Sequence, residues 1–269
     1  MKTIWRLVIG LFLPAFVISC FDPPEYPIVP EIEFKSIKFV DPPDTPDSKG
    51  QVAFDTLVLS IDFKDGDGDI GFSDDDLNVS ETTAQYAERI YYDTKGQKWA
   101  IGDLFQLSQS KDPYDINLYN SLIKFSDKKN PPLDTLPGFT KPYDCINWEI
   151  LKNEEVDPVV IIDTLYFKLN PNHYNIFVDF FVNTNGTFEE YDFREELCST
   201  FDGRLPILSK DLSQENPLQG TIRYAMAGSG FKFIFGLTKP MKLRVQIQDR
   251  NLNKSNVIET DAFTLNQIK

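Results

Sequence analysis

The sequence predicts a mainly β protein, an antiparallel immunoglobulin-like sandwich with a long irregular insertion that contains short helices. Three observations predict this class. Short segments with strand-like alternation recur along the chain, Gly, Pro and Asn residues separate them, and an aromatic content of 13% can fill a substantial core. We expect the sandwich to span residues 31–269, with the insertion at about residues 73–157.

Residues 1–19 have the order of a secretory signal peptide. Lys2 and Arg6 precede an apolar stretch, residues 7–18, and no acidic residue lies among them. This stretch is too short to cross a bilayer as a helix, which needs roughly 20 apolar residues, and it contains Pro14. We therefore expect cleavage rather than a permanent transmembrane segment.

The four residues 17–20, Val-Ile-Ser-Cys, resemble the lipobox of bacterial lipoproteins. The resemblance implies cleavage after Ser19 and a lipid on Cys20. The alternative is an ordinary signal peptide with a chance cysteine. Residues 20–30 contain four prolines, which oppose helix formation and favour an extended spacer, so we interpret this segment as a tether.

The charge of the chain limits its partners. The net charge is -14, and removal of residues 1–19 leaves 25 basic against 41 acidic side chains, or -16. An acidic surface repels phosphate backbones and anionic lipids. This argues against nucleic acid as a partner and leaves the lipid as the expected contact with the membrane.

The expected elements follow in chain order. Residues 26–40 alternate imperfectly and suit a first strand, residues 42–50 form a turn-rich loop, and residues 57–63 alternate clearly as a second strand. Within the insertion we expect short helices near residues 81–89 and 116–125 and a hairpin at residues 93–97. Strand signals return at residues 159–169, 174–182 and 221–227, a glycine turn leads into residues 231–235, and the last pair is 243–248 with 257–265.

Two cysteines remain besides Cys20, namely Cys145 and Cys198. An even pair in an oxidising compartment is a candidate disulfide. Two buried thiols are the alternative, and spacing alone does not decide between them.

The most distinctive motif is the loop that follows the second strand. Asp65, Asp67 and Asp69 alternate with glycines, and three more aspartates follow at residues 74–76. Such carboxylates repel one another unless a cation neutralises them, and calcium prefers oxygen ligands on a flexible backbone. The spacing resembles an EF-hand loop, but Ile70 stands where that loop needs glycine and a strand precedes it. We predict a structural calcium site, with a solvated acidic turn as the alternative.

Topology adds further candidate ligands. In an immunoglobulin-like sandwich, the loop after the second strand and the loop before the last strand lie at the same end. The second of these loops spans residues 249–256. Asp249, Asn251 and Asn253 could therefore complete the coordination shell.

The lipobox, the tether, the Asp-Gly-Asp-Gly-Asp-Ile-Gly loop at residues 65–71 and the Asp-Arg-Asn-Leu-Asn-Lys-Ser-Asn loop at residues 249–256 together resemble lipoproteins of Bacteroidota outer membranes. The resemblance covers the two ends of the chain. It implies immunoglobulin- or fibronectin-like domains, and some such lipoproteins accompany barrels that import nutrients or assemble other barrels. Asp-Thr-Leu triplets at residues 55, 134 and 163 resemble the O-glycosylation site of that phylum, and Thr135 is the expected acceptor.

The sequence gives little support for catalysis. Its single histidine, His173, lies in a turn without a recognisable nucleophile motif, so we expect no enzyme. We expect a non-catalytic accessory or binding subunit of an outer-membrane complex. The rival is a surface glycan-binding lipoprotein that delivers oligosaccharides to an importer. Aromatic residues of the insertion would serve either role if exposed, or form its core if buried: Tyr91, Tyr92, Trp99, Tyr119, Tyr143 and Trp148.

Overall fold

The computed structural model describes residues 25–43, 45, 48, 50, 53–73, 86–99, 121–139, 145–153, 160–228 and 230–269. Cys20 and the first part of the tether lie outside these residues, as do Asp74, Asp75 and Asp76. In the described part of the chain, no helix is long and apolar enough to cross a membrane.

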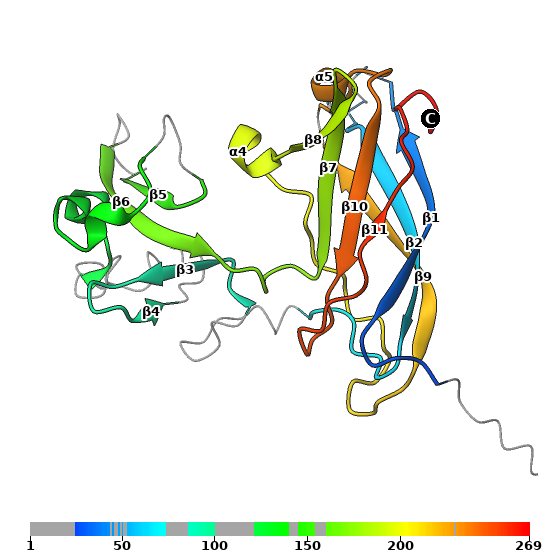
Figure 1. Ribbon diagram of the computed structural model, residues 1–269, viewed down its shortest axis with the longest axis horizontal. Coiled ribbons are helices and arrows are strands. Elements are labelled where there is room, and N and C mark those ends of the chain that lie inside the picture. The colour runs from blue at the N-terminus through cyan, green and yellow to red at the C-terminus, as the bar shows by residue number, and fades with distance from the viewer. Residues whose placement is uncertain are drawn as a thin grey trace, which may run out of the picture.

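Two antiparallel sheets form the larger part of the molecule, which we call the sandwich (Figure 1). One sheet has the order β1-β2-β9 and the other β11-β10-β7-β8. Their strands are β1 (Glu31–Val40), β2 (Thr56–Asp65), β7 (Ile176–Thr184), β8 (Thr187–Tyr191), β9 (Leu218–Ala227), β10 (Met241–Ile247) and β11 (Ile258–Glu259). The mainly β, antiparallel class predicted from the sequence is confirmed.

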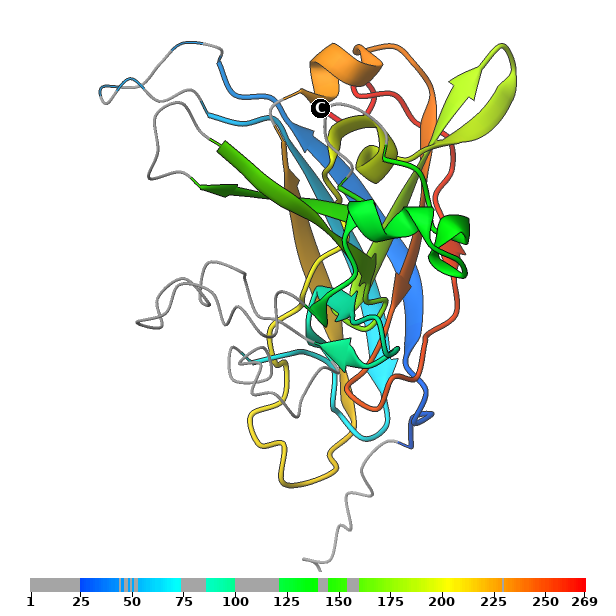
Figure 2. The same ribbon diagram turned by 90° about the vertical axis from the view of Figure 1, so that its left-hand side faces the viewer.

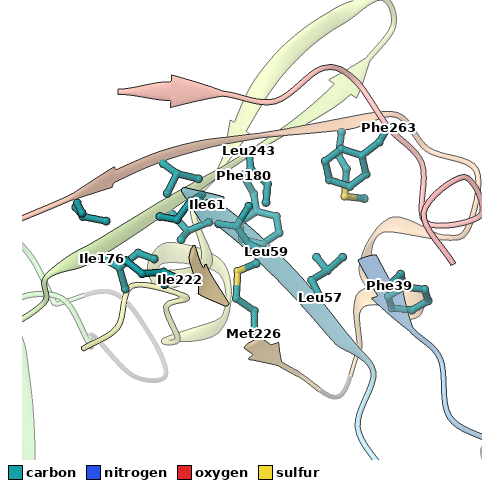
Figure 3. Packing of buried hydrophobic residues seen from close by; sticks show 14 of the residues in the cluster. Phe39, Leu57, Leu59, Ile61, Ile176, Phe180, Ile222, Met226, Leu243 and Phe263 are labelled. Carbon is teal, nitrogen blue, oxygen red and sulfur yellow. The ribbon is translucent and has the colours of Figure 1, made fainter. Parts of the chain in front are cut away.

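The core of the sandwich lies between the two sheets. Strands β2 and β10 bury every second side chain, because successive residues of a strand point to opposite faces of its sheet. Leu57, Leu59 and Ile61 from one sheet meet Phe180 and Leu243 from the other (Figure 3). This continuous apolar contact holds the two sheets together, since burial of apolar surface is the main favourable term in folding.

A second body, which we call the small lobe, projects from one side of the sandwich (Figures 1 and 2). Its sheet has the order β4-β3-β6-β5. The strands are β3 (Arg89–Tyr92), β4 (Lys98–Trp99), β5 (Trp148–Asn153) and β6 (Val160–Leu169), and two 3-10 helices accompany them, η3 (Phe125–Lys129) and η4 (Leu133–Thr135). The chain enters the lobe after β2 and leaves it before β7, so the lobe is an insertion between two sandwich strands.

The lobe differs from the sequence expectation in two respects. The segment expected to be irregular contains ordered strands, and β6, expected among the sandwich strands, pairs instead with β3 and β5. The predicted hairpin at residues 93–97 is confirmed, because this turn joins β3 to β4. Alternation of apolar and polar residues predicts a strand but not the strand with which it pairs. The backbone N–H and C=O groups that form the pairing are the same in either sheet.

The expected helices near residues 81–89 and 116–125 fall partly outside the described residues. Where the chain is described, Arg89 already belongs to β3, and Leu122 and Lys124 form isolated bridges to Asp93 and Leu165. Helix is therefore wrong for Arg89 and for residues 122–124, whereas Tyr86 has 3-10 geometry and Ser121 is α-helical. The strand partners Asp93 and Leu165 satisfy backbone groups that a helix would have satisfied internally.

Two segments of the sandwich also differ from expectation. Residues 231–235, which follow the glycine turn, form the short helix α5 (Phe231–Phe235) and bury Phe231 and Phe235. The last strand is shorter than residues 257–265, because only Ile258 and Glu259 pair regularly, while Phe263 rejoins Met241 through an isolated bridge. A further short helix, α4 (Phe193–Leu197), lies near the junction with the small lobe.

Candidate metal centre

Three carboxylates meet where β2 ends. Asp65 is the last residue of β2 and is fully buried, while Asp67 and Asp69 follow in the loop and are partly buried. One side-chain oxygen of each residue lies within 4.8 Å of those of the other two. The alternating Asp and Gly residues thus bring the three carboxylates into one cluster, as the spacing predicted.

Glycine allows the loop to take this shape. Gly68 has φ of 72°, in the left-handed region that side chains rarely adopt, and an added Cβ would lie 2.1 Å from the Asn216 backbone oxygen. The backbone amide of Asn216 donates to the backbone oxygen of Asp67 at 3.3 Å. The loop is therefore held tightly against the neighbouring segment, and its carboxylates turn inward.

The buried oxygens of this cluster lack ordinary partners. Both oxygens of Asp65 and one oxygen each of Asp67 and Asp69 are shielded from solvent and accept no hydrogen bond within the described part of the chain. A buried polar group without a partner costs free energy, and a buried unpaired charge costs much more. Four such oxygens at one point make the cluster a candidate cation site.

The electrostatics agree with this geometry. The pKa of Asp65 is raised to about 7, chiefly by burial and in addition by the adjacent Asp67 and Asp69 carboxylates. The pKa of Asp69 is raised to about 6, chiefly by burial and in addition by the charges of Asp249 and Asp67. Negative charge is therefore unfavourable at this cluster unless a positive partner offsets it.

Asp249, at the start of the loop between β10 and β11, approaches this cluster. It is fully buried, and burial raises its pKa, with the charge of Asp67 contributing in the same direction. The predicted meeting of the two loops is thus seen in the structure. The side-chain amide of Asn251 lies 3.5 Å from Asp67 Oδ2, and rotation of that amide would present its oxygen to the cluster.

Asn253 contacts the candidate ligand Asp249. Its backbone N–H donates to Asp249 Oδ1 at 2.7 Å and its side-chain amide donates to Asp249 Oδ2 at 2.8 Å. These bonds fix the Asp249 carboxylate in place. Asn253 therefore positions a candidate ligand.

Sequence reasoning did not identify Arg250. Its guanidinium donates to the backbone oxygen of Gly71 at 3.3 Å, and its charge lowers the pKa of Asp69. Its backbone oxygen accepts from the hydroxyl of Tyr86 at 3.2 Å, which connects this loop to the base of the small lobe. A cationic side chain between two candidate ligands, Asp249 and Asn251, is the signal that could have revealed it.

Cys145 and Cys198 form a disulfide, with their Cα atoms 5.5 Å apart. Cys145 precedes β5 of the small lobe, and Cys198 is the C-cap of α4. The bond therefore links the lobe to the segment that follows β8. Of the two alternatives that the sequence left open, the structure has the disulfide.

The aromatic residues of the lobe form its interior where they are described. Trp148 and Tyr91 are 1% and 2% exposed, and Trp148 packs against Phe125 and Tyr166. Tyr92 is partly buried. Tyr119, Tyr143 and the side chain of Trp99 lie outside what the structure describes. Trp148 and Tyr91 are therefore core residues and offer no open ring to a sugar.

Other sequence candidates lie apart from the carboxylate cluster. Thr135 ends η4 and is exposed, with its hydroxyl donating to the backbone oxygen of Pro132 at 3.0 Å. His173 packs against Tyr174, and its Nδ1 lies 2.8 Å from the backbone oxygen of Tyr86. Burial lowers the pKa of His173, which favours the neutral ring. This histidine thus contributes to the junction between the lobe and the sandwich.

A cavity of about 420 Å³ lies between α4, β9 and α5, away from the carboxylates. Phe193, Phe201 and Phe231 form part of its wall, and the charged side chains of the described residues lie outside it. The hydroxyl of Tyr224 borders it and donates to the backbone oxygen of Phe201 at 3.0 Å. Aromatic rings and polar groups therefore line the cavity together.

Comparisons with protein-family models, with curated proteins and with solved structures find no match for this chain.

Proposed function

We propose that this chain is a non-catalytic, lipid-anchored binding protein of a bacterial outer membrane, in which a structural calcium ion holds the loops at one end of the sandwich. The observation that carries the calcium site is the set of four buried carboxylate oxygens without hydrogen-bond partners at Asp65, Asp67 and Asp69. The lipid anchor rests on the sequence at Cys20.

Calcium fits this donor set better than a transition metal. All candidate donors are oxygens: the carboxylates of Asp65, Asp67, Asp69 and Asp249, and the amide oxygen of Asn251. Calcium takes six to eight oxygen ligands in flexible geometry, whereas zinc and copper favour sites with nitrogen or sulfur. Among the residues that the structure describes, the cluster contains aspartates and neither histidine nor cysteine. The ion would neutralise the carboxylates and hold two loops together.

The strand order supports an immunoglobulin-like assignment of the sandwich. Such folds place strands A, B and E in one sheet and G, F and C in the other, and an extra strand can follow C. In chain order, the seven sandwich strands that the structure describes correspond to A (β1), B (β2), C (β7), C′ (β8), E (β9), F (β10) and G (β11). With these letters, the two sheets have the orders A-B-E and G-F-C-C′. The small lobe is then an insertion between B and C.

The binding role is assigned to the small lobe. Immunoglobulin-like sandwiches commonly present partner-binding elements on their inter-strand connections. Here the connection between β2 and β7 contains a body with its own sheet. The disulfide and the Tyr86–Arg250 bond attach the lobe to the sandwich. We propose a protein partner in an outer-membrane complex, since Trp148 and Tyr91 are buried and cannot stack on a glycan.

Thermal unfolding with calcium and with chelator tests the metal site. Calcium at about 100 times its dissociation constant should stabilise the folded protein by roughly 2.7 kcal/mol. Asp67→Ala should remove most of this response, while Asp261→Ala, which removes an exposed aspartate from the segment after β11, should retain it. Identical melts with calcium and with chelator, together with no bound metal in elemental analysis, would reduce the cluster to an acidic turn.

Membrane fractionation and affinity purification test the remaining parts of the proposal. Cys20→Ala should leave the protein unlipidated and remove it from the outer-membrane fraction. When the intact lipoprotein is purified from solubilised membranes, an outer-membrane protein should co-purify with it in a stoichiometric amount. Normal fractionation of the variant argues against the anchor, and a monomer that binds oligosaccharide in calorimetry would favour the glycan-binding rival.

A further inference from the structure

The end of the tether lies directly against the carboxylate loop. The backbone amide of Gly66 donates to the backbone oxygen of Pro27 at 2.8 Å. An added Cβ on Gly66 would lie 2.4 Å from the backbone oxygen of Tyr26 and 2.8 Å from that of Pro27. Gly66 stands between Asp65 and Asp67, so the tether touches the loop between two candidate ligands.

This contact depends on the shape of the loop. The Gly66 amide points to Pro27 because the backbone from Asp65 to Asp67 is curved. The same curvature brings one carboxylate oxygen of each aspartate within 4.8 Å of those of the other two. Without a cation, repulsion between buried carboxylates favours a more open loop. With a cation, the closed loop is the favoured state, and its outer side offers the amide to the tether.

The same end of the sandwich carries the N-terminal segment away from the body. In Figure 1 the chain before β1 leaves beside the end of β2, whereas the C-terminus lies at the opposite end of the sandwich. Tyr26 is half-buried there and Pro30 is buried, while Ile28 between them is 63% exposed. Contacts at Tyr26 and Pro27 therefore set the direction in which the chain leaves the sandwich.

We propose that the cation fixes the tether on the sandwich, so that occupancy of the site determines the orientation of the body relative to its lipid anchor. The inference rests on the proposed calcium site and adds a consequence to it. With the ion bound, the tether leaves the body in one direction. Without the ion, the tether swings freely from β1.

Linkage makes this coupling reciprocal. If the cation favours the docked tether, then the docked tether must favour the cation by the same factor. Gly66→Ala inserts a methyl group against the Tyr26 and Pro27 oxygens without removing a candidate ligand. We expect it to weaken calcium binding about fivefold or more, within the usual range of coupling between sites.

Gly138→Ala is the matched control for this variant. Its added Cβ would meet nothing within 4 Å, and its backbone is not in the left-handed region. Calcium affinity measured by calorimetry on the intact, detergent-solubilised lipoprotein should be unchanged in this variant. Equal affinity in Gly66→Ala, Gly138→Ala and the parent protein would overturn the coupling.

Distance measurements between spin labels test the orientation directly. One pair of labels, on cysteines introduced at Ile28 and Glu189, measures the distance between the tether and β8. A second pair, at Lys38 and Glu189, measures a distance within the sandwich. Calcium should narrow the first distance distribution, chelator should broaden it, and the second should stay the same. Asp67→Ala should keep the first distribution broad in either condition.

The possible failures are distinct. If calcium binds and raises the melting temperature but leaves the distribution from Ile28 to Glu189 unchanged, the coupling is wrong and the metal site stands. If calcium neither binds nor stabilises the protein, the proposed site is wrong and the coupling falls with it.

Discussion

The sandwich and the small lobe are held together in different ways. In the sandwich, two sheets bury a continuous set of apolar side chains, with the carboxylate cluster at one end and the ion pairs of Lys232 with Asp41 and Asp55 at the other. In the lobe, a ring cluster around Trp148 and Tyr166 lies beside a polar network in which Glu149 accepts from the Tyr91 hydroxyl and pairs with Arg89 at 3.0 Å. The sandwich therefore depends mainly on a large apolar core between its sheets, whereas in the lobe the polar pairs lie directly beside a much smaller apolar cluster.

The attachment between the two bodies is correspondingly limited. In the described residues they share no sheet, and the links include the Cys145–Cys198 disulfide, the ring contact of Phe72 with Tyr86, and polar contacts near Tyr86 and Tyr174. Regions with fewer buried contacts open at lower free energy than the core of a domain. We infer that the lobe can unfold or reorient while the sandwich remains folded.

The largest expected effect comes from Trp148→Ala. Trp148 is 1% exposed, contacts Phe125 and Tyr166, and donates from Nε1 to the Pro137 backbone oxygen at 3.2 Å. Truncation of a buried Trp costs about 3–5 kcal/mol. Hydrogen exchange should speed up in β5 and β6 and stay slow in β2 and β10.

Leu59→Ala provides the contrast within the sandwich. Leu59 is fully buried between the two sheets, and its truncation should cost about 2–5 kcal/mol of global stability. Exchange in β2 and β10 should then accelerate. If Trp148→Ala also accelerates exchange in these strands, the two bodies unfold as one unit and the comparison fails.

Loss of the disulfide should have the next largest effect. Cys145 and Cys198 are 53 residues apart, and a bond over such a separation typically contributes 2–4 kcal/mol by restricting the unfolded chain. In the Cys145→Ser, Cys198→Ser double variant, calorimetry should show the lobe unfolding in a separate transition before the sandwich. A single transition at the parental midpoint would show that the bond does not hold the lobe.

Several features of the sandwich could be predicted from the sequence because they are local. Alternation in residues 57–63 predicts the buried face of β2, since period two is itself the geometry of a strand. The meeting of Asp65, Asp67 and Asp69 follows from their spacing. The approach of Asp249 followed from topology, because inter-strand loops of a sandwich cluster at its two ends.

The lobe could not be predicted in the same way. The partners of β6 depend on contacts between segments far apart in sequence, such as Trp148 with Tyr166 and Arg89 with Leu169. The Phe-Lys-Phe-Ile-Phe segment at residues 231–235 has the alternation of a strand but forms α5, because its Phe231 and Phe235 rings, four residues apart, both face the core. Tertiary packing overrode the local pattern in both places.

The smallest of the four predicted effects is a pH dependence that arises in the carboxylate cluster of the sandwich. The pKa of Asp65 is raised to about 7 and that of Asp69 to about 6, chiefly by burial. The pKa of an unfolded aspartate is about 4. At pH values between about 4 and these raised pKa values, the folded protein therefore binds more protons than the unfolded chain. Without calcium, stability should therefore fall as pH rises from 5 to 8.

The size of this pH effect follows from the raised pKa values of Asp65 and Asp69. One pKa unit corresponds to about 1.4 kcal/mol, so the loss between pH 5 and pH 8 should be on the order of 2 kcal/mol. Lys232 and Lys269 lower the pKa of Asp41, so Asp41 titrates below this window. In the lobe, burial raises the pKa of Tyr91, which stays protonated throughout the window.

Urea unfolding of the intact protein at pH 5 and pH 8, in chelator and in calcium, measures the effect. Calcium should reduce or reverse the loss at pH 8, because the ion binds the deprotonated carboxylates and competes with protons. Asp65→Asn removes the group with the largest shift and should flatten the dependence measured in chelator. Equal stability of the chelated parent protein at the two pH values would mean that these carboxylates are already neutralised within the fold, and that the sandwich, like the lobe, satisfies its buried charge without an ion.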